Sequence, residues 1–508
     1  MERERSVIAD EVGDRSHLRD AVSSTLTTTR RGDGTGLPGT TGTTTGPTRN
    51  GRSLRSVDPL IADLVDREAQ RQADKLVMIP SESVPHPAVL DALASPFTSL
   101  YAEGYAPSRM RASSLDDLAR IDAHLATHRE RGNRRFYQGA ELADLAESIA
   151  ERRTAARFAT DRSPAEAIHV NVQPLSGSVA NLAVYEALLE PGDVLLAMAL
   201  PEGGHLTHGS PYSVAGRRYH KVPYGTDPET RRIDYDEIRY LAREHRPRLL
   251  VGGFTSYPWC PDWEAFREIA DEVGAFLLAD VAHAAGLIVG GVYPNPVGIA
   301  DVVTLTTHKT LCGPRGAAIL STDEEIAHRI DRAVFPGLQG GPHVNKIAAI
   351  AVAMELAGQD AFRDLQRRVV ENARQLADAL DRQGLTLAYG GTDTHLLLVD
   401  LRPLGLAGRA VARALDRVGI VCNQNAIPGD RNGADPHGIR LGTTWATQRG
   451  MGPDAMADLA AIIARVLRAL ARHAEAGGDD EDLDADPLAS DLARAEEEAR
   501  ALVAVQTP

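Results

Sequence analysis

The sequence predicts an α/β fold built on a mostly parallel sheet, with a second, smaller α/β domain toward the C-terminus. Short apolar runs alternate with helical patterns through the middle of the chain, at residues 194–198, 249–253, 276–280 and 302–306. Strands that are apolar on both faces are typical of parallel sheets covered by helices on either side. Beyond about residue 357 the pattern changes to long helices rich in Arg, Ala and Leu around two further apolar runs, 394–399 and 419–422, which indicates the second domain.

The length of 508 residues exceeds what one hydrophobic core usually supports, so we expect several domains. Apolar residues make up 43% of the chain and charged residues 25%, as is typical of a folded protein. After Pro487, helical spacing of apolar residues predicts a short amphipathic helix (Leu488, Leu492, Ala495, Ala499 and Leu502). The expected segments are a disordered Thr/Gly/Pro-rich tail at 1–53, an arm at 54–90, a large domain at 91–357, a small domain at 358–476 and an acidic tail at 477–508.

The charge and cysteine content argue against several classes of protein. The net charge is −15, of which the stretch from Asp479 to Arg500 supplies −8, so we expect no basic surface for nucleic acid. The chain has no run of about 18 apolar residues and no signal-peptide pattern, so we expect neither a membrane span nor export. Its three scattered cysteines lack any CxxC pair, which favours a reducing cytoplasm and supports no disulfide framework or metal site.

Two of the predicted strands are followed by residues that would suit one cofactor. Asp280 ends one apolar run, and Lys309 comes shortly after another. Polar residues at the carboxyl ends of parallel strands are the first place to look for chemistry. A carboxylate that keeps a pyridine nitrogen protonated and a lysine that forms an imine are the groups that pyridoxal phosphate requires. Taken alone, Lys309 is about equally well explained as a surface charge at a strand end.

Two segments with small residues could hold the phosphate of the same cofactor. The segment Ser176-Gly177-Ser178 precedes a helical pattern, and small residues at a helix start offer N–H groups and hydroxyls to an anion. The simpler interpretation of this segment is an ordinary helix cap. The loop from Phe335 to Pro342 contains three glycines before a helix expected at 345–357, and its simpler interpretation is a tight turn.

Together these segments resemble the serine hydroxymethyltransferase (glycine hydroxymethyltransferase) family over roughly residues 57–470. The similarity lies in five stretches: Tyr101 to Tyr105, Gly203 to Gly209, Asp280 to His283, Thr307 to Gly316 and Phe335 to Gly341. The resemblance implies a fold-type I pyridoxal-phosphate transferase with a seven-stranded, mostly parallel sheet, acting as a homodimer or homotetramer with shared active sites. It also implies that L-serine and tetrahydrofolate are converted reversibly to glycine and 5,10-methylenetetrahydrofolate.

The resemblance implies a role for each residue at a matching position. Lys309 would carry the cofactor covalently, Asp280 would hold the pyridine nitrogen, and His205 would stack on the ring. Glu103 would move protons during serine cleavage and contact the folate, and Arg440 would bind the amino-acid carboxylate. Further cofactor contacts would come from Ser176, Gly177, Ser178, Thr255, His283 and His308 and, across the subunit boundary, from Tyr101, Gly340 and Gly341. Ser81 and the catalytic Tyr137 would bind the substrate, and Gly204, Leu206 and Asn425 would hold the folate.

The chain departs from the family's pattern at the substrate rim and by an insertion. Phe136 stands where the family usually has the first tyrosine of a pair, and Leu175 stands where a histidine is usual. The insertion covers residues 106–135, where a capping box at Ser114 and apolar residues on one face (Leu115, Leu118, Ile121 and Leu125) predict an amphipathic helix. The insertion could act as a lid or dimer contact, but a packed surface elaboration is favoured because most insertions are tolerated loops.

Two classes of alternative function remain, related enzymes and a non-catalytic protein. Phe136 and the insertion motivate a folate-independent threonine aldolase or transaldolase, or an α-methylserine hydroxymethyltransferase, of the same family. The other alternative is a binding or regulatory protein that has kept the fold and lost catalysis. The joint presence of Lys309, Asp280 and Arg440 argues against it, because a protein without catalysis has no need for an imine-forming lysine.

Overall fold

The computed structural model describes residues 53–132, 135–431, 436–479 and 482–505. The disordered tail expected at 1–53 therefore lies outside the described residues, except for Ser53. The chain divides into two compact units, residues 1–65 and 66–508. The described part of the first unit consists of α1 (Leu54–Val57) and the start of α2 (Pro59–Asp74), and its larger apolar side chains, among them Leu60 and Leu64, are exposed, whereas Ala62 is buried.

The second unit contains the expected α/β fold, with a seven-stranded sheet in the order β2-β8-β7-β6-β5-β3-β4. The sheet is mostly parallel, and only β8 runs antiparallel to its neighbours. The four apolar runs of the sequence are strands with the predicted bounds: β3 (Val194–Met198), β5 (Leu249–Gly253), β6 (Phe276–Asp280) and β7 (Val302–Thr306). The other three strands are β2 (His169–Asn171), β4 (His220–Tyr224) and β8 (Ala317–Ser321).

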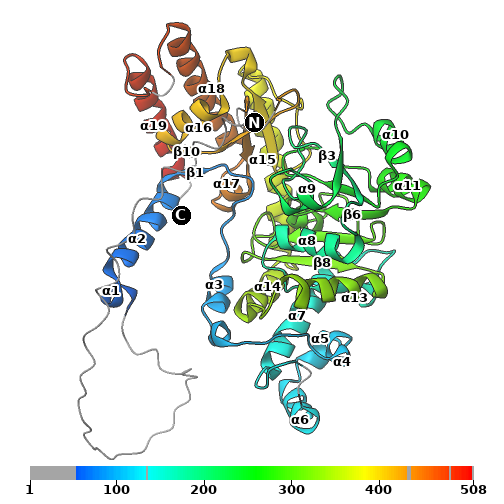
Figure 1. Cartoon of the computed structure of the whole chain (residues 1–508). Helices are drawn as coiled ribbons and strands as arrows, with labels where there is room; N and C mark the ends of the chain where they lie inside the picture. Colours follow the sequence, from blue (N-terminus) through cyan, green and yellow to red (C-terminus); the bar gives the residue numbers. More distant parts are fainter. Residues whose placement is uncertain (1–52, 133–134, 432–435, 480–481, 506–508) are drawn as a thin grey trace, which may run out of the picture. The chain divides into compact units, whose positions relative to one another are not determined.

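Helices cover both faces of this sheet (Figure 1), which explains why its central strands are mostly apolar on both faces. Leu195 and Ala197 of β3 pack into one hydrophobic cluster, whereas Leu196 and Met198 pack into another, as the alternation of a strand requires. The first cluster includes residues of α8 (Gly177–Leu188), α9 (Val214–Arg218) and α13 (Glu324–Arg332). The second includes residues of α7 (Glu141–Phe158), α10 (Tyr235–His245), α11 (Trp263–Val273), α12 (Ala285–Val289) and α14 (Val344–Leu356). The shorter elements beside them are α3 (Pro87–Leu93), η1 (Pro96–Ser99), η2 (Ala165–Ala167) and η3 (Ala333–Leu338).

The C-terminal part of the chain forms a further core around a small antiparallel sheet. That sheet has the order β11-β12-β9, and β1 pairs with β10 beside it. Helix α19 lies against α18 (Figure 1), and the predicted apolar face of α19 is buried in this core, so the acidic tail contributes to it. The strands are β1 (Leu76–Val77), β9 (Leu396–Asp400), β10 (Ile420–Val421), β11 (Asn423–Asn425) and β12 (Gly438–Gly442). The helices are α15 (Asp360–Arg382), η4 (Arg402–Leu404), α16 (Gly408–Arg417), α17 (Thr444–Gln448), α18 (Pro453–Glu475) and α19 (Leu488–Val505).

The prediction that the insertion forms a single amphipathic helix is wrong. The insertion forms three short helices instead, α4 (Ser108–Arg111), α5 (Leu115–Leu118) and α6 (Ile121–Arg131). The N-cap of the expected capping box is present, since Ser114 Oγ accepts a hydrogen bond from the N–H of Asp117 at 3.1 Å. The helix breaks at Arg120, whose backbone is not helical, so Leu118 is buried against Met110 and Leu145. Ile121, by contrast, lies on α6, a helix that buries none of its side chains.

Among the described residues, no helix has both the length and the apolar character needed to cross a membrane.

Candidate active site

Lys309 lies directly beyond β7 in a largely buried position. Its exposed fraction is 9%, and burial lowers the pKa of its amino group to about 8, an effect that the charge of Asp280 partly opposes. Among the described residues, its Nζ forms neither a hydrogen bond nor an ion pair. The desolvation cost of the buried ammonium group is only partly offset by Asp280, so the neutral, nucleophilic form of Lys309 is favoured.

Asp280, the last residue of β6, is buried and surrounded by hydrogen-bond donors. Its Oδ2 accepts from Asn181 Nδ2 at 2.8 Å and lies 3.0 Å from His208 Nε2, and its Oδ1 accepts from the N–H of Ala282 at 3.0 Å. Burial would raise the pKa of Asp280, but the hydrogen bonds of His208 and Asn181 hold it well below its usual range. The carboxylate therefore stays ionised at neutral pH and can stabilise a protonated ring nitrogen.

His205 lies next to this group and carries no charge at neutral pH. Its Nδ1 lies 2.7 Å from Thr207 Oγ1, and its ring meets that of His208 edge to face at 5.6 Å between centroids. Burial, reinforced by His208, lowers the pKa of His205 to about 4. A neutral imidazole of this kind suits stacking on a flat aromatic ring.

The Ser176-Gly177-Ser178 segment forms the N-terminus of α8, as the sequence predicts. Ser176 is the N-cap, and its side chain accepts a hydrogen bond from the N–H of Val179 at 3.4 Å. Gly177 packs so closely on β7 that an added Cβ would lie 2.8 Å from Thr306 Cγ2. Glycine thus lets a helix N-terminus, which favours anions, approach the strand end that leads to Lys309.

Arg440 on β12 is a buried cation with only neutral partners among the described residues. Its Nη1 donates to Thr255 O at 2.5 Å and to Thr255 Oγ1 at 3.2 Å, and its Nε donates to Asn423 Oδ1 at 3.2 Å. Burial lowers the pKa of the guanidinium to about 10, so it remains charged at neutral pH. Burying an arginine without a carboxylate is costly, and a ligand carboxylate would offset that cost.

Thr255 connects Arg440 to a pair of histidines. Thr255 Oγ1 lies 3.4 Å from His283 Nε2, and His283 Nδ1 lies 3.2 Å from Nε2 of His395, on which it stacks. Burial and the nearby charges of Lys309 and Arg440 hold the pKa of His283 well below its ordinary value. These contacts place Thr255, His283 and Arg440 in one group.

A second group of predicted residues gathers around Glu103. Its Oε1 accepts a hydrogen bond from the Tyr101 hydroxyl at 3.3 Å, and the rings of Tyr101 and Tyr137 meet edge to face at 4.8 Å. An added Cβ would lie 3.1 Å from Glu103 Oε1 at Gly340 and 3.1 Å from the Tyr101 ring at Gly341. Within the described part of the chain, no hydrogen bond, ion pair or ring contact joins this group to Lys309, Asp280 or Arg440.

The remaining predicted residues, those expected to contact the substrate or the folate, belong to neither of these two groups. Ser81 is half-buried in a segment whose Ser83 donates to the carbonyl of His308 at 2.9 Å. Gly204 is packed tightly, since an added Cβ would lie 2.2 Å from Met198 O. Leu206 is half-exposed, and Asn425 Nδ2 donates to Ser256 Oγ at 3.3 Å.

Sequence reasoning missed the residues that support Asp280 and His283, chiefly Asn181, His208 and His395. The sequence held a local indication of two of these residues. His208 follows His205 by three residues in a glycine-rich segment, and Asn181 lies one helical turn beyond Ser178. Nothing local marked His395, which reaches the site only through the packing of β9.

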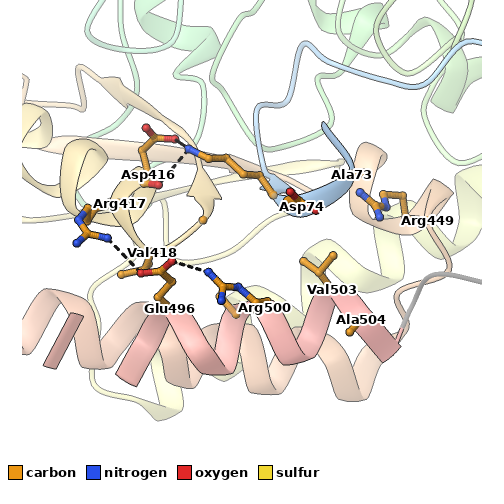
Figure 2. Close-up of a pocket in the computed structure, with 13 residues that line it drawn as sticks. Ala73, Asp74, Asp416, Arg417, Val418, Arg449, Glu496, Arg500, Val503 and Ala504 are labelled. Atoms are coloured by element: carbon orange, nitrogen blue, oxygen red, sulfur yellow. Dashed lines mark hydrogen bonds and ion pairs between the residues drawn. The ribbon is translucent and has the colours of Figure 1, made fainter. Parts of the chain in front are cut away.

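A cavity of about 800 Å³ lies away from all of these residues, with α19 as one wall (Figure 2). Its charged side chains already have partners: Arg417 and Arg500 both pair with Glu496, at 3.1 and 2.8 Å, and Lys75 pairs with Asp416 at 2.6 Å. Arg449 donates to the carbonyl of Gln72 and Asp74 accepts from Gln70, both at 2.7 Å, so each charged side chain of the lining has a partner among the described residues.

Comparison with known proteins finds strong similarity over most of the chain. A family model described as serine hydroxymethyltransferase matches residues 54–128 and 127–463. A serine hydroxymethyltransferase of Acidothermus cellulolyticus is 49% identical over 83% of this chain and 91% of that protein. One from Sorangium cellulosum is 49% identical over 82% of this chain and 91% of its own length. Serine hydroxymethyltransferase 1 of Bordetella parapertussis is 46% identical over 84% and 92%, respectively.

Proposed function

The chain belongs to the serine hydroxymethyltransferase family, and we propose that it reversibly converts L-serine and tetrahydrofolate to glycine and 5,10-methylenetetrahydrofolate. The observation that carries this proposal is the pair of buried cations without carboxylate partners, Lys309 and Arg440. One is suited to form an imine and the other to bind an amino-acid carboxylate.

The residues around Lys309 fit pyridoxal phosphate. Lys309 has a lowered pKa and, within the described residues, no hydrogen-bond or ion-pair partner; Asp280 is ionised, and the N-terminus of α8 at Ser176 offers N–H groups to a phosphate. We assign the covalent attachment to Lys309, the ring nitrogen to Asp280 and the phosphate to the Ser176-Gly177-Ser178 segment. The bound cofactor supplies the electron sink for the electron pair left on Cα when the Cα–Cβ bond of serine breaks.

The chain's own side chains orient the amino acid and handle its protons. Arg440 would bind the substrate carboxylate with its planar fork, and Ser81 and Tyr137 would assist it. Glu103 would exchange a proton with the hydroxymethyl oxygen as the Cα–Cβ bond breaks or forms. His205, kept neutral by burial, would stack on the cofactor ring without adding a positive charge beside it.

We further propose that active sites are shared between subunits of a homodimer or homotetramer. The group around Glu103 includes Tyr101, Gly340 and Gly341 and, among the described residues, has no hydrogen bond or ion pair to Lys309. A group of this kind can complete the Lys309 site of a neighbouring subunit. Tetrahydrofolate would then lie near Glu103, Gly204, Leu206 and Asn425.

Serine cleavage with and without tetrahydrofolate tests the proposed reaction. We expect glycine formation from L-serine to depend strongly on tetrahydrofolate, with methylenetetrahydrofolate as the second product. A rate that is indifferent to folate would favour an aldolase or transaldolase, and a preference for α-methylserine would favour the related hydroxymethyltransferase. Phe136 is 78% exposed, and its ring meets that of Phe335 edge to face at 5.7 Å between centroids. The hydroxyl missing at this position is the feature expected to shift the substrate preference.

A further inference from the structure

Arg135, the last residue of the insertion, is a fully buried cation that uses its whole guanidinium group. Its Nε donates to Asp144 Oδ1 at 2.6 Å, and its Nη2 donates to Glu147 Oε2. Both carboxylates belong to α7, and all three side chains are shielded from solvent. The guanidinium is thereby fixed in position and orientation by two charge-assisted hydrogen bonds.

The remaining nitrogen of Arg135 holds the backbone on both sides of Glu103. Nη1 donates to Ala102 O at 2.8 Å and to Gly104 O at 2.9 Å. The carbonyl of Glu103 itself accepts from the N–H of Phe136 at 3.1 Å. Gly104 makes this arrangement possible, because its φ of +101° is a conformation that residues with side chains rarely adopt.

A second donor supports the same backbone. Gln173 Nε2 donates to Gly104 O at 2.9 Å and to Glu147 Oε1 at 2.8 Å. The three carbonyls of residues 102–104 are therefore all held, those of Ala102 and Gly104 by buried side chains and that of Glu103 by a backbone N–H. The Glu103 side chain extends toward Tyr101 and Gly340. The backbone of Glu103, the proposed proton carrier, is thus held in place, and its carboxylate lies beside Tyr101 rather than among the buried side chains.

We infer that Arg135 is a positioning residue, which sets the location of the Glu103 carboxylate through the carbonyls of Ala102 and Gly104. This inference rests on the proposed function, in which Glu103 moves protons. Lysine cannot replace Arg135 in this role, because a single ammonium group cannot reach two carboxylates and two carbonyls in fixed directions. A lysine at position 135 would therefore keep the positive charge between Asp144 and Glu147 but lose the fixed hydrogen bonds to the carbonyls of Ala102 and Gly104.

The experiment is a double-mutant cycle on the cofactor-loaded protein with Arg135→Lys, Glu103→Gln and the double variant. We expect Arg135→Lys to lower kcat about 10- to 100-fold while the KM for serine changes less than about threefold. In the Glu103→Gln background, Arg135→Lys should lower kcat less than about twofold, because the carboxylate that Arg135 positions is no longer present. The visible absorbance of the bound cofactor should stay unchanged in all variants.

Arg111→Lys is the matched control. Arg111 also bridges two carboxylates, at 3.1 Å to Glu151 and 2.7 Å to Asp331, but it bonds none of the carbonyls of residues 102–104. Its substitution should lower Tm and leave kcat within about twofold. If Arg135→Lys does not fold, Glu147→Gln in the same cycle loosens the guanidinium without removing it, and a smaller loss that again vanishes beside Glu103→Gln is expected.

Three results would overturn the inference. Losses of kcat that multiply in the double variant would show that Arg135 acts independently of Glu103, and full activity of Glu103→Gln would remove the group to be positioned. A loss of cofactor absorbance in proportion to activity would show a general structural role. A fourth result, absence of folate-dependent serine cleavage by the wild-type protein, would overturn the proposed function itself and, with it, the inference.

Discussion

His208 Nε2 lies 3.0 Å from Asp280 Oδ2, and the surrounding contacts indicate that the histidine is the donor. The N–H of His205 points at His208 Nδ1 at 3.4 Å, so Nδ1 accepts and Nε2 carries the proton. This hydrogen bond is the strongest influence that lowers the pKa of Asp280 against its burial. His208 therefore helps to keep the carboxylate ionised for the ring nitrogen of the cofactor.

Replacement of His208 by leucine should weaken cofactor binding. The loss of one hydrogen bond to a buried carboxylate costs about 1.5–3 kcal/mol, so the Kd for pyridoxal phosphate should rise about 10- to 100-fold. Absorbance titration of the apoprotein measures this change. His220→Leu, at an exposed histidine of β4, should leave the Kd unaltered, and equal effects of the two variants would contradict the role of His208.

The lowered pKa of Lys309 predicts an unusual pH dependence of cofactor capture. Burial favours the neutral amine and lowers the pKa from 10.5 to about 8, and only the neutral amine is nucleophilic. The capture rate of the apoprotein should rise about tenfold from pH 7 to pH 9 and then level off, whereas an ordinary lysine would give about 100-fold over the same interval and continue to rise. Stopped-flow absorbance distinguishes these profiles, and Lys309→Ala should show no capture.

Arg440→Lys should impair binding of the amino acid far more than binding of the cofactor. The substitution keeps the charge but removes the planar fork, and we expect the KM for serine to rise about 100-fold. Steady-state kinetics at saturating cofactor measure the effect. Arg409→Lys on the exposed side of α16 is the control, and a rise in KM that is matched by loss of cofactor absorbance would argue against carboxylate binding by Arg440.

The fold and the centre of the site could be predicted because both follow from local patterns. The four buried strands are short, mostly apolar runs, and the parallel sheet brings the residues that follow them to one edge. Asp280 and Lys309 thus fall into one region once the strands are assigned. The family resemblance then supplied the distant partners, such as Arg440, that no local pattern places beside them.

The insertion and the polar core behind Glu103 could not be predicted, for a different physical reason. Arg135 lies in a charged stretch typical of a solvated surface, and only the tertiary fold shows that it is buried against Asp144 and Glu147. Likewise, the apolar spacing from Leu115 to Ile121 assumes one continuous helix, whereas the helix breaks at Arg120. Burial of paired charges and helix breaks without Gly or Pro both depend on contacts distant in sequence.

Helix α19 should stabilise the C-terminal core without affecting the chemistry. It lies outside the residues matched by the family model, yet Leu492 is 3% exposed and packs within the same cluster as α18. Leu492→Ala should therefore destabilise the protein by about 2–5 kcal/mol, because it removes buried apolar surface and leaves a cavity. Thermal unfolding followed by circular dichroism measures the loss as a lower Tm. Leu142→Ala, at a leucine that is 45% exposed on α7, is the matched control and should have a much smaller effect. Since no predicted site residue lies on α19, kcat of Leu492→Ala below its Tm should equal that of the wild type, and a loss of kcat without a loss of Tm would show that the helix serves the site instead.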